Sequence, residues 1–277
     1  MMDALVSTRW LGEELGAPDL AIVDSTLFLG GRNARAEYLA RHIPGARFLD
    51  IDAVADHSHA APHMLPNATA FAAAMESLGV RSDDRIVVYD NSPLRSAVRG
   101  WFMLRHFGAR QVAILDGGFG KWVAEGRFTE SGKPAPRVAR FDAREPRDQI
   151  VRKDQIPGLS LPLVDARGRA RFEGSEADPR AGVAPGHIPG ANNLPYPDLW
   201  NDDGTMKDVD AIRAAFAVAG ADPQAPFVAT CGSGVTANSL IFAAHRLGND
   251  AAKLYDGSWS EWGADPATPK ELGPAKP

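Results

Sequence analysis

The sequence predicts an α/β fold made of two tandem copies of one domain, each a mainly parallel sheet flanked by helices. Two observations predict it. Several distinctive short stretches occur twice in the same order, with an offset of about 140 residues. Within each copy, brief apolar runs alternate with longer helix-like stretches, which is the pattern of parallel strands joined by crossover helices.

The repeat is carried by three pairs of matching segments. "AIVDS" matches "LPLVDAR", "RHIPGARFLDID" matches "GHIPGANNLPY", and "VAILDGGFGKW" matches "AKLYDGSWSEW". The segments align the following pairs: Asp24 with Asp165, His42 with His187, Asp116 with Asp256, and Trp122 with Trp262. The two histidines lie in repeated "HIPG" turns, so we expect them to be structural.

The domain boundary is predicted near residue 145. Residues 129–145 hold two prolines and many charges but have no apolar period, so we interpret them as a linker. The first domain then covers 1–145, with the linker included, and the second covers 146–277.

The apolar runs and helix-like stretches give the expected elements in order. Each helix-like stretch ends in glycine, as helix C-terminal caps often do. Strands are predicted at 20–24, 85–90 and 112–117, and then at 161–166, 226–231 and 252–257. Helices are predicted over 68–79 and 98–108, and then over 208–220 and 235–248.

Composition indicates a soluble globular chain. Apolar residues make up 44% of the 277 residues and the net charge is −5, which gives no field to attract nucleic acid or an anionic membrane. The apolar runs are too short to span a bilayer, and the first residues lack the pattern of a secretory signal. With one cysteine there is no internal disulfide, which suits a reducing cytoplasm.

The single cysteine, Cys231, lies at a strand-to-helix turn in the second copy, where the first copy has Asp90. The following helix is predicted to begin near Val235 or Thr236. Backbone N–H groups of a glycine-rich turn and a helix start stabilise negative charge, so this position favours a reactive thiolate. A small, inert buried cysteine is the alternative.

The residues around Cys231 argue against three other kinds of cysteine site: a phosphatase, a protease and a metal site. A cysteine phosphatase loop needs an arginine where this chain has Ala237. No signature of the known cysteine proteases surrounds the thiol. One cysteine with scattered histidines also lacks the spacing of metal ligands, so neither a metal nor another cofactor is expected.

The two-fold repeat with a cysteine loop only in the second copy resembles the rhodanese superfamily. Three segments, "CGSGVTA" (231–237), "HMLP" (63–66) and "DGSWSEW" (256–262), are similar to the 3-mercaptopyruvate sulfurtransferases in particular. Thiosulfate sulfurtransferases usually place at least one cation directly after the cysteine, where this chain has Gly232 and Ser233.

The resemblance implies a sulfur relay. Cys231 would take sulfur from 3-mercaptopyruvate as a persulfide, release pyruvate, and pass the sulfur to a thiol such as thioredoxin or to cyanide. The loop amides would bind the persulfide charge: those of Gly232, Ser233, Gly234, Val235, Thr236 and Ala237.

Two arginines and a polar relay are also implied. Arg171 and Arg180 match the family stretches that hold the carboxylate and carbonyl of the substrate, whereas Arg167 and Arg169 are expected to be solvated. Ser233, His63 and Asp52 match a Ser-His-Asp relay for proton transfer. Simple packing of His63 and Asp52 between the two halves is the alternative.

Two other functions remain open. A thiosulfate:cyanide sulfurtransferase would share the persulfide but use another donor. A non-catalytic sulfur-carrying or interaction module would have no turnover. Arg95, where some relatives have an aromatic residue, would favour thiosulfate as a secondary substrate if its side chain reached the site.

Overall fold

The computed structural model describes residues 2–144 and 148–276, which form two compact units. The first unit contains residues 2–56, 65–144 and 202–206, and the second contains 57–64, 148–201 and 207–276. Each unit therefore holds one copy of the repeat together with a short segment from the other half. The predicted boundary between 145 and 146 lies outside the described residues.

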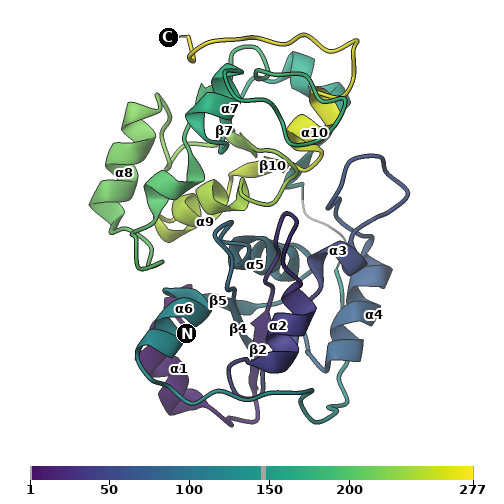
Figure 1. Ribbon diagram of the computed structural model, residues 1–277, viewed down its shortest axis with the longest axis vertical. Coiled ribbons are helices and arrows are strands. Elements are labelled where there is room, and N and C mark those ends of the chain that lie inside the picture. The colour runs from purple at the N-terminus through teal and green to yellow at the C-terminus, as the bar shows by residue number, and fades with distance from the viewer. Residues whose placement is uncertain (1, 145–147, 277) are drawn as a thin grey trace. The chain divides into compact units, whose positions relative to one another are not determined.

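Each unit is built on one five-stranded parallel sheet flanked by helices (Figure 1). The strand orders are β1-β5-β4-β2-β3 and β6-β10-β9-β7-β8, the same order in both repeats. The predicted α/β fold is confirmed. The strands are β1 (Leu5–Val6), β2 (Leu20–Asp24), β3 (Arg47–Phe48), β4 (Arg85–Tyr89), β5 (Gln111–Leu115), β6 (Ile150–Val151), β7 (Leu163–Asp165), β8 (Asn192–Asn193), β9 (Val228–Thr230) and β10 (Lys253–Tyr255).

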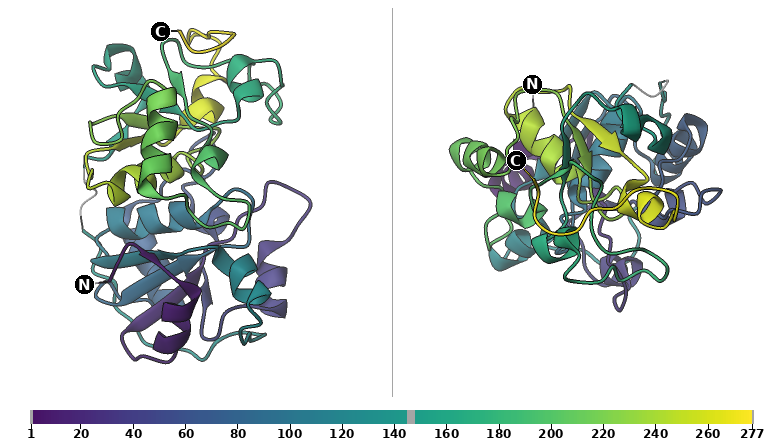
Figure 2. Two further views of the ribbon diagram at one scale, coloured as in Figure 1. Left: turned by 90° about the vertical axis from the view of Figure 1, so that its left-hand side faces the viewer. Right: turned by 90° about the horizontal axis from the view of Figure 1, so that it is seen from above.

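Helices pack around each sheet, as the two further views in Figure 2 show. In the first unit they are α1 (Thr8–Glu14), α2 (Ala34–Ala40), α3 (Ile51–Val54), α4 (Ala68–Leu78), α5 (Ala97–His106) and α6 (Gly118–Ala124). In the second unit they are η1 (Lys153–Gly158), α7 (Arg169–Glu173), η2 (Tyr196–Leu199), α8 (Val209–Val218), α9 (Asn238–Arg246) and α10 (Ser258–Trp262), where η marks a 3-10 helix.

The three central strands of each sheet were predictable because they are covered on both faces. Such strands are continuously apolar, and from the second residue onward every residue of β2, β4 and β5 is buried. The two-residue edge strands β1, β3, β6 and β8 were not predicted, since so short a run has no period to recognise.

The sheet register places the chemistry-bearing residues at neighbouring strand ends. In the second unit Asp165, the last residue of β7, pairs with Thr230, the last residue of β9, and Cys231 comes next. In the first unit Asp24 pairs with Tyr89, and Asp90 comes next. Both sheets therefore carry a carboxylate beside the loop that ends the central strand.

The two carboxylates differ in their partners. Asp165 forms an ion pair of 2.6 Å with Arg167, and both side chains are at most 2% exposed. In the first unit Thr26 occupies the position of Arg167, so Asp24 has no cation at that position: it accepts from the N–H of Thr26 at 2.9 Å, from the Thr26 hydroxyl at 2.5 Å, and from the side chain of Tyr89. Burial raises the pKa of Asp24 to about 6, which the hydrogen bonds from Thr26 only partly offset.

Asp24→Asn is expected to stabilise the first unit at neutral pH. Because the folded-state pKa of Asp24 is raised, its ionisation opposes folding as the pH rises from about 4 through about 6, and the penalty is complete above that range. Urea unfolding at about pH 8 should give a gain on the order of 1–3 kcal/mol that disappears near pH 4.

The equivalent substitution in the second unit, Asp165→Asn, is the matched control. It leaves the buried Arg167 without its counter-charge and should destabilise by about 3–5 kcal/mol. Equal effects of the two substitutions would contradict this account of the two sites.

Candidate active site

The cysteine loop, residues 231–237, connects β9 to α9 at the carboxyl end of the second sheet. Ligands bind at such ends in open α/β sheets. Cys231 is 1% exposed. Helix α9 begins at Asn238 with Ala237 as its N-cap, so the prediction of a start near Val235 or Thr236 was wrong. The carbonyls of Val235, Thr236 and Ala237 accept from the first amides of α9 through tight three-residue turns, so the regular helix begins only at Asn238.

The first two loop carbonyls are held by the start of α10. The N–H of Trp259 donates to the carbonyl of Cys231 at 3.0 Å, and the N–H of Ser260 donates to that of Gly232 at 2.8 Å. These are amides of the first helical turn, which have no acceptor inside their own helix. They fix the direction in which the loop backbone turns as it leaves the strand.

Two further loop carbonyls, those of Gly234 and Val235, are held by Asn238. Its buried side-chain amide donates to the carbonyl of Gly234 at 2.7 Å and to that of Val235 at 3.0 Å. Gly234 has a φ of +73°, and a Cβ there would lie 2.5 Å from the carbonyl oxygen of Asp256. Only glycine fits at this position.

Unlike these carbonyls, most of the loop amides are unoccupied. Among the described residues the structure gives no hydrogen-bond acceptor to the backbone N–H groups of Gly232, Ser233, Val235, Thr236 and Ala237. Five unoccupied donors thus follow one buried cysteine within six residues, and a set of this kind can bind an anion.

The amide of Gly234 is the exception, because it donates to Ser258. The Ser258 hydroxyl accepts from the N–H groups of Cys231 and Gly234, both at 3.1 Å, and donates to the carbonyl of Tyr255 at 2.8 Å. Ser258 has a φ of +51°, where the first unit has a glycine, Gly118, at +57°. A serine in this strained region is explained by the three bonds of its hydroxyl.

Ser233 and His63 come together as the sequence suggested. The Ser233 hydroxyl lies 2.9 Å from Nδ1 of His63, which belongs to the 57–64 segment of the second unit. The backbone of His63 is left-handed, with a φ of 61°. Asp52 lies on α3 in the other unit, and its side chain is exposed, so its part in a relay stays a prediction.

Arg171 and Arg180 lie beside the loop, held by a carboxylate that was not predicted. Asp178, 2% exposed, accepts from Arg171 at 2.6 Å and from Arg180 at 3.2 Å. Burial opposes its charge, but bonds from the Arg180 amide and the Arg171 side chain lower its pKa overall. A Cβ on Gly232 would lie 3.4 Å from a guanidinium nitrogen of each arginine. The absent side chain lets both cations approach the loop.

The expectation for Arg167 was wrong, and that for Arg169 was right. Arg167 is buried, paired with Asp165, and stacked 4.6 Å from the ring centre of Trp259. Arg169 is 59% exposed. Arg167 and Arg169 have similar sequence neighbours, in "ARGRAR", so the sequence does not distinguish them. Arg167 is buried because it pairs with Asp165 at the buried end of β7.

The equivalent loop of the first unit is filled by its own side chain. Asp90 stands in the place of Cys231, and its carbonyl likewise accepts from an α6 amide, that of Phe119, at 2.9 Å. Its carboxylate accepts from the N–H groups of Ser92 at 2.9 Å and Ala97 at 2.6 Å. Amides of this loop therefore already hold an anion, which is part of the protein.

Comparison with known proteins identifies the family. The rhodanese-like domain matches this chain twice, over residues 7–125 and 147–265. The chain belongs to the rhodanese family. Its tandem rhodanese domains are 42% identical over 271 residues to mouse 3-mercaptopyruvate sulfurtransferase, with 94% of this chain and 91% of the mouse protein aligned.

Two further rhodanese relatives are named for different sulfur donors. Bovine thiosulfate sulfurtransferase is 39% identical over 271 residues, covering 94% of this chain and 91% of that protein. The crystal structure of the 3-mercaptopyruvate sulfotransferase SseA from Escherichia coli superposes with a TM-score of 0.85 at 37% identity, covering 94% of this chain and 100% of the other.

The described part of this rhodanese chain lacks two features, a membrane-spanning helix and a cluster of metal ligands. No helix there is both long and apolar enough to cross a membrane. Over the same residues, no group of three or more His, Cys, Asp or Glu side chains could hold a metal ion.

Ser258→Ala is expected to destabilise the second unit by about 2–4 kcal/mol. It leaves two buried amides and one carbonyl without their partner and keeps a non-glycine residue at positive φ. Ser258→Gly removes the same bonds but relieves the backbone, so it should be milder by about 1 kcal/mol. Denaturant unfolding measures both.

Ser260→Ala is the control, because its hydroxyl donates to Gly257 and its backbone N–H, which holds Gly232, is kept. A Ser258→Ala protein no less stable than Ser260→Ala would mean that the hydroxyl does not anchor the loop.

Proposed function

We propose that this chain is an enzyme that transfers sulfur from 3-mercaptopyruvate, through a persulfide on Cys231, to a thiol acceptor or to cyanide. The observation that carries the proposal is a loop of five unoccupied amides that follows a buried cysteine, with two guanidinium groups close to Gly232. The loop amides would bind an anionic sulfur, and the two guanidinium groups would bind an anionic substrate. The names of the mouse and E. coli relatives support the same donor.

The first half-reaction transfers the sulfur. The Cys231 thiolate attacks the sulfur of mercaptopyruvate, so that an S–S bond forms while the C–S bond breaks. The electron pair of the broken bond goes to C3 of the substrate, giving the enolate of pyruvate, which takes up one proton, while the transferred sulfur loses the proton of the substrate thiol. The persulfide that remains on Cys231 carries negative charge on its outer sulfur, where the loop amides donate to it.

The two arginines would orient the substrate. Mercaptopyruvate carries a carboxylate and an adjacent carbonyl, and guanidinium forks suit both oxygens. Nε of Arg171 is buried and lacks a hydrogen-bond partner among the described residues, so one donor of this side chain is available to a ligand. Asp178 keeps Arg171 and Arg180 in place before substrate arrives, which lowers the entropy lost on binding.

Ser233 and His63 would handle the proton. Their 2.9 Å contact allows the Ser233 hydroxyl to exchange a proton with the His63 imidazole. Ser233 is separated from Cys231 by one residue in the sequence. Asp52 completes the proposed relay as the group that would orient His63. The proton delivered to the enolate of pyruvate is the step that this pair would serve.

In the second half-reaction a thiolate acceptor attacks the outer sulfur and leaves Cys231 as a thiolate. A dithiol protein such as thioredoxin would then form a disulfide and release sulfide, while cyanide would leave as thiocyanate. An acceptor of this kind requires a reducing compartment, so a cytoplasmic location is part of the proposal.

The mass of the intact protein tests the persulfide. After incubation with mercaptopyruvate, wild-type protein should gain one sulfur atom, and Cys231→Ser should gain none. Ser233→Ala should still gain sulfur but more slowly, since it keeps the thiol and loses the proton path. The absence of added sulfur on wild type, or equal addition to Cys231→Ser, would favour a non-catalytic module.

The donor is decided by comparing kcat/KM for mercaptopyruvate and thiosulfate in the same assay with cyanide. We expect mercaptopyruvate to be the better donor, because Gly232 and Ser233 bring no cation into the loop to meet the thiosulfate dianion. A higher kcat/KM for thiosulfate would make this chain a thiosulfate sulfurtransferase, with the persulfide mechanism kept.

Arg171→Ala and Arg180→Ala are each expected to lower kcat/KM for mercaptopyruvate by an amount equivalent to about 1.5–3 kcal/mol, through loss of a charged hydrogen bond. Arg171→Lys keeps the charge that Asp178 needs and so separates substrate binding from folding. Arg169→Ala, an exposed arginine on the same helix, is the control and should be neutral. Unchanged kinetics in both alanine variants would refute the assignment.

A further inference from the structure

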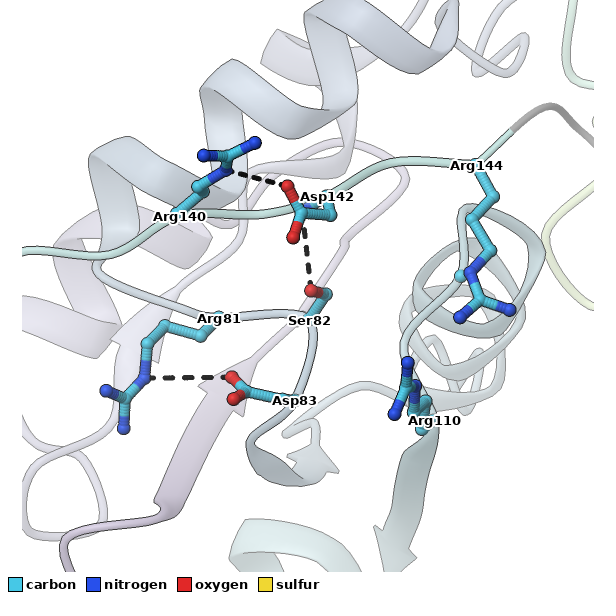
Figure 3. A pocket seen from close by; sticks show the side chains of 8 residues that line it. Arg81, Ser82, Asp83, Arg110, Arg140, Asp142 and Arg144 are labelled. Atoms are coloured by element: carbon cyan, nitrogen blue, oxygen red, sulfur yellow. Dashed lines mark hydrogen bonds and ion pairs between the residues drawn. The ribbon is translucent and has the colours of Figure 1, made fainter.

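A second cationic cavity lies in the first unit, at the opposite edge of its sheet from the Asp90 loop (Figure 3). It has a volume of about 430 Å³. Three segments line it: Arg81, Ser82 and Asp83 before β4, Gly108 and Arg110 before β5, and Arg140, Asp142 and Arg144 in the stretch after α6. None of these residues takes part in the proposed sulfur transfer.

Two of its four arginines are neutralised within the protein. Arg81 pairs with Asp84 at 3.2 Å and with Asp83 at 3.9 Å. Arg140 pairs with Asp142 at 2.7 Å. These pairs occupy one side of the cavity in Figure 3.

Arg110 and Arg144 have no acidic partner among the described residues, and Figure 3 shows their guanidinium groups turned toward each other on the side away from these ion pairs. Both side chains are exposed, so each could have turned into solvent. In a chain of net charge −5, two facing cations without a counter-ion leave a local positive potential, which an anion between them would neutralise.

The backbone holds the two arginines in place. The N–H of Arg144 donates to the carbonyl of Phe107 at 3.1 Å, and the N–H of Arg110 donates to that of Ser82 at 3.4 Å. The stem of Arg144 packs over Gly108, where a Cβ would lie 3.0 Å from its Cγ. The two backbone positions are thus fixed before a ligand arrives, and the contact with Gly108 also limits the stem of Arg144.

We propose that this cavity binds a small phosphorylated anion, with its phosphoryl oxygens between Arg110 and Arg144. Guanidinium forks match phosphate geometry. The volume lies in the range of small-molecule sites, roughly 300–1,000 Å³, and so has room for more than one phosphoryl group. Asp83 and Asp142 at the opposite side would repel a ligand whose charge extended across the whole cavity.

Isothermal titration of the full chain with inorganic pyrophosphate tests the site. Wild-type protein should bind saturably, and the double variant Arg110→Gln/Arg144→Gln should bind at least about tenfold more weakly, because each substitution removes charged hydrogen bonds. Arg9→Gln is the matched control: it removes an exposed arginine of the same unit, on α1, and should leave the affinity unchanged.

Two further titrations test which ligand binds and at which site. Citrate at matched ionic strength should bind more weakly than pyrophosphate, and equal binding would overturn the phosphoryl assignment. The variant Arg171→Lys should keep wild-type affinity, since it changes only the loop site. No saturable binding to wild type, or equal affinity in the double variant, would overturn the proposed cavity site. Retained sulfur loading of the double variant shows that it is folded.

Discussion

The site depends on the direction in which the backbone of the cysteine loop faces. A peptide unit presents its N–H and its carbonyl on opposite sides, so amides can converge on a sulfur only if the carbonyls are bonded elsewhere. Here the α10 amides and the Asn238 side chain bond four of them. The loop is consequently preorganised: its donors do not have to reorient when charge develops, which is the main source of electrostatic stabilisation in enzymes.

The repeat shows how the equivalent loops of the two units differ. Both loops join equivalent strands and receive an equivalent bond from the following helix, through Trp259 in one and Phe119 in the other. In the first unit the loop amides of Ser92 and Ala97 are occupied by the Asp90 carboxylate. Burial raises the pKa of Asp90, and these two amides offset part of that effect. The first loop thus has an anion-binding backbone with a carboxylate where the second loop has a thiol.

Much of the fold could be predicted from sequence because the signals were local or repeated. Buried parallel strands are continuous apolar runs, and the two-fold repeat supplied each prediction twice. The site was predicted less completely. Arg167 was taken as solvated, since its sequence neighbours are charged, and only the sheet register shows that it neutralises Asp165.

Ser258, Asn238 and Asp178 were missed because each acts through bonds to segments distant in sequence or through backbone groups that leave no pattern. One of them did leave a signal. The repeat aligns Ser258 with Gly118, and a serine in place of a left-handed glycine marks a side chain that is needed there.

The preference for a sulfur donor follows from the positions of the cationic side chains near the loop. Overall sequence identity to the relatives does not decide it. The mouse and bovine relatives differ by only a few percent in identity to this chain, yet they carry the names of different donors. The loop itself has no cation, and its positive charge comes from Arg171 and Arg180, which approach from α7 and the segment after it past the bare backbone of Gly232. Cations set beside the loop suit a donor whose carboxylate is separated from its sulfur by two carbon atoms. A compact dianion such as thiosulfate, with its charge next to the transferred sulfur, is better met by a cation within the loop, so the geometry and the loop sequence favour the same donor.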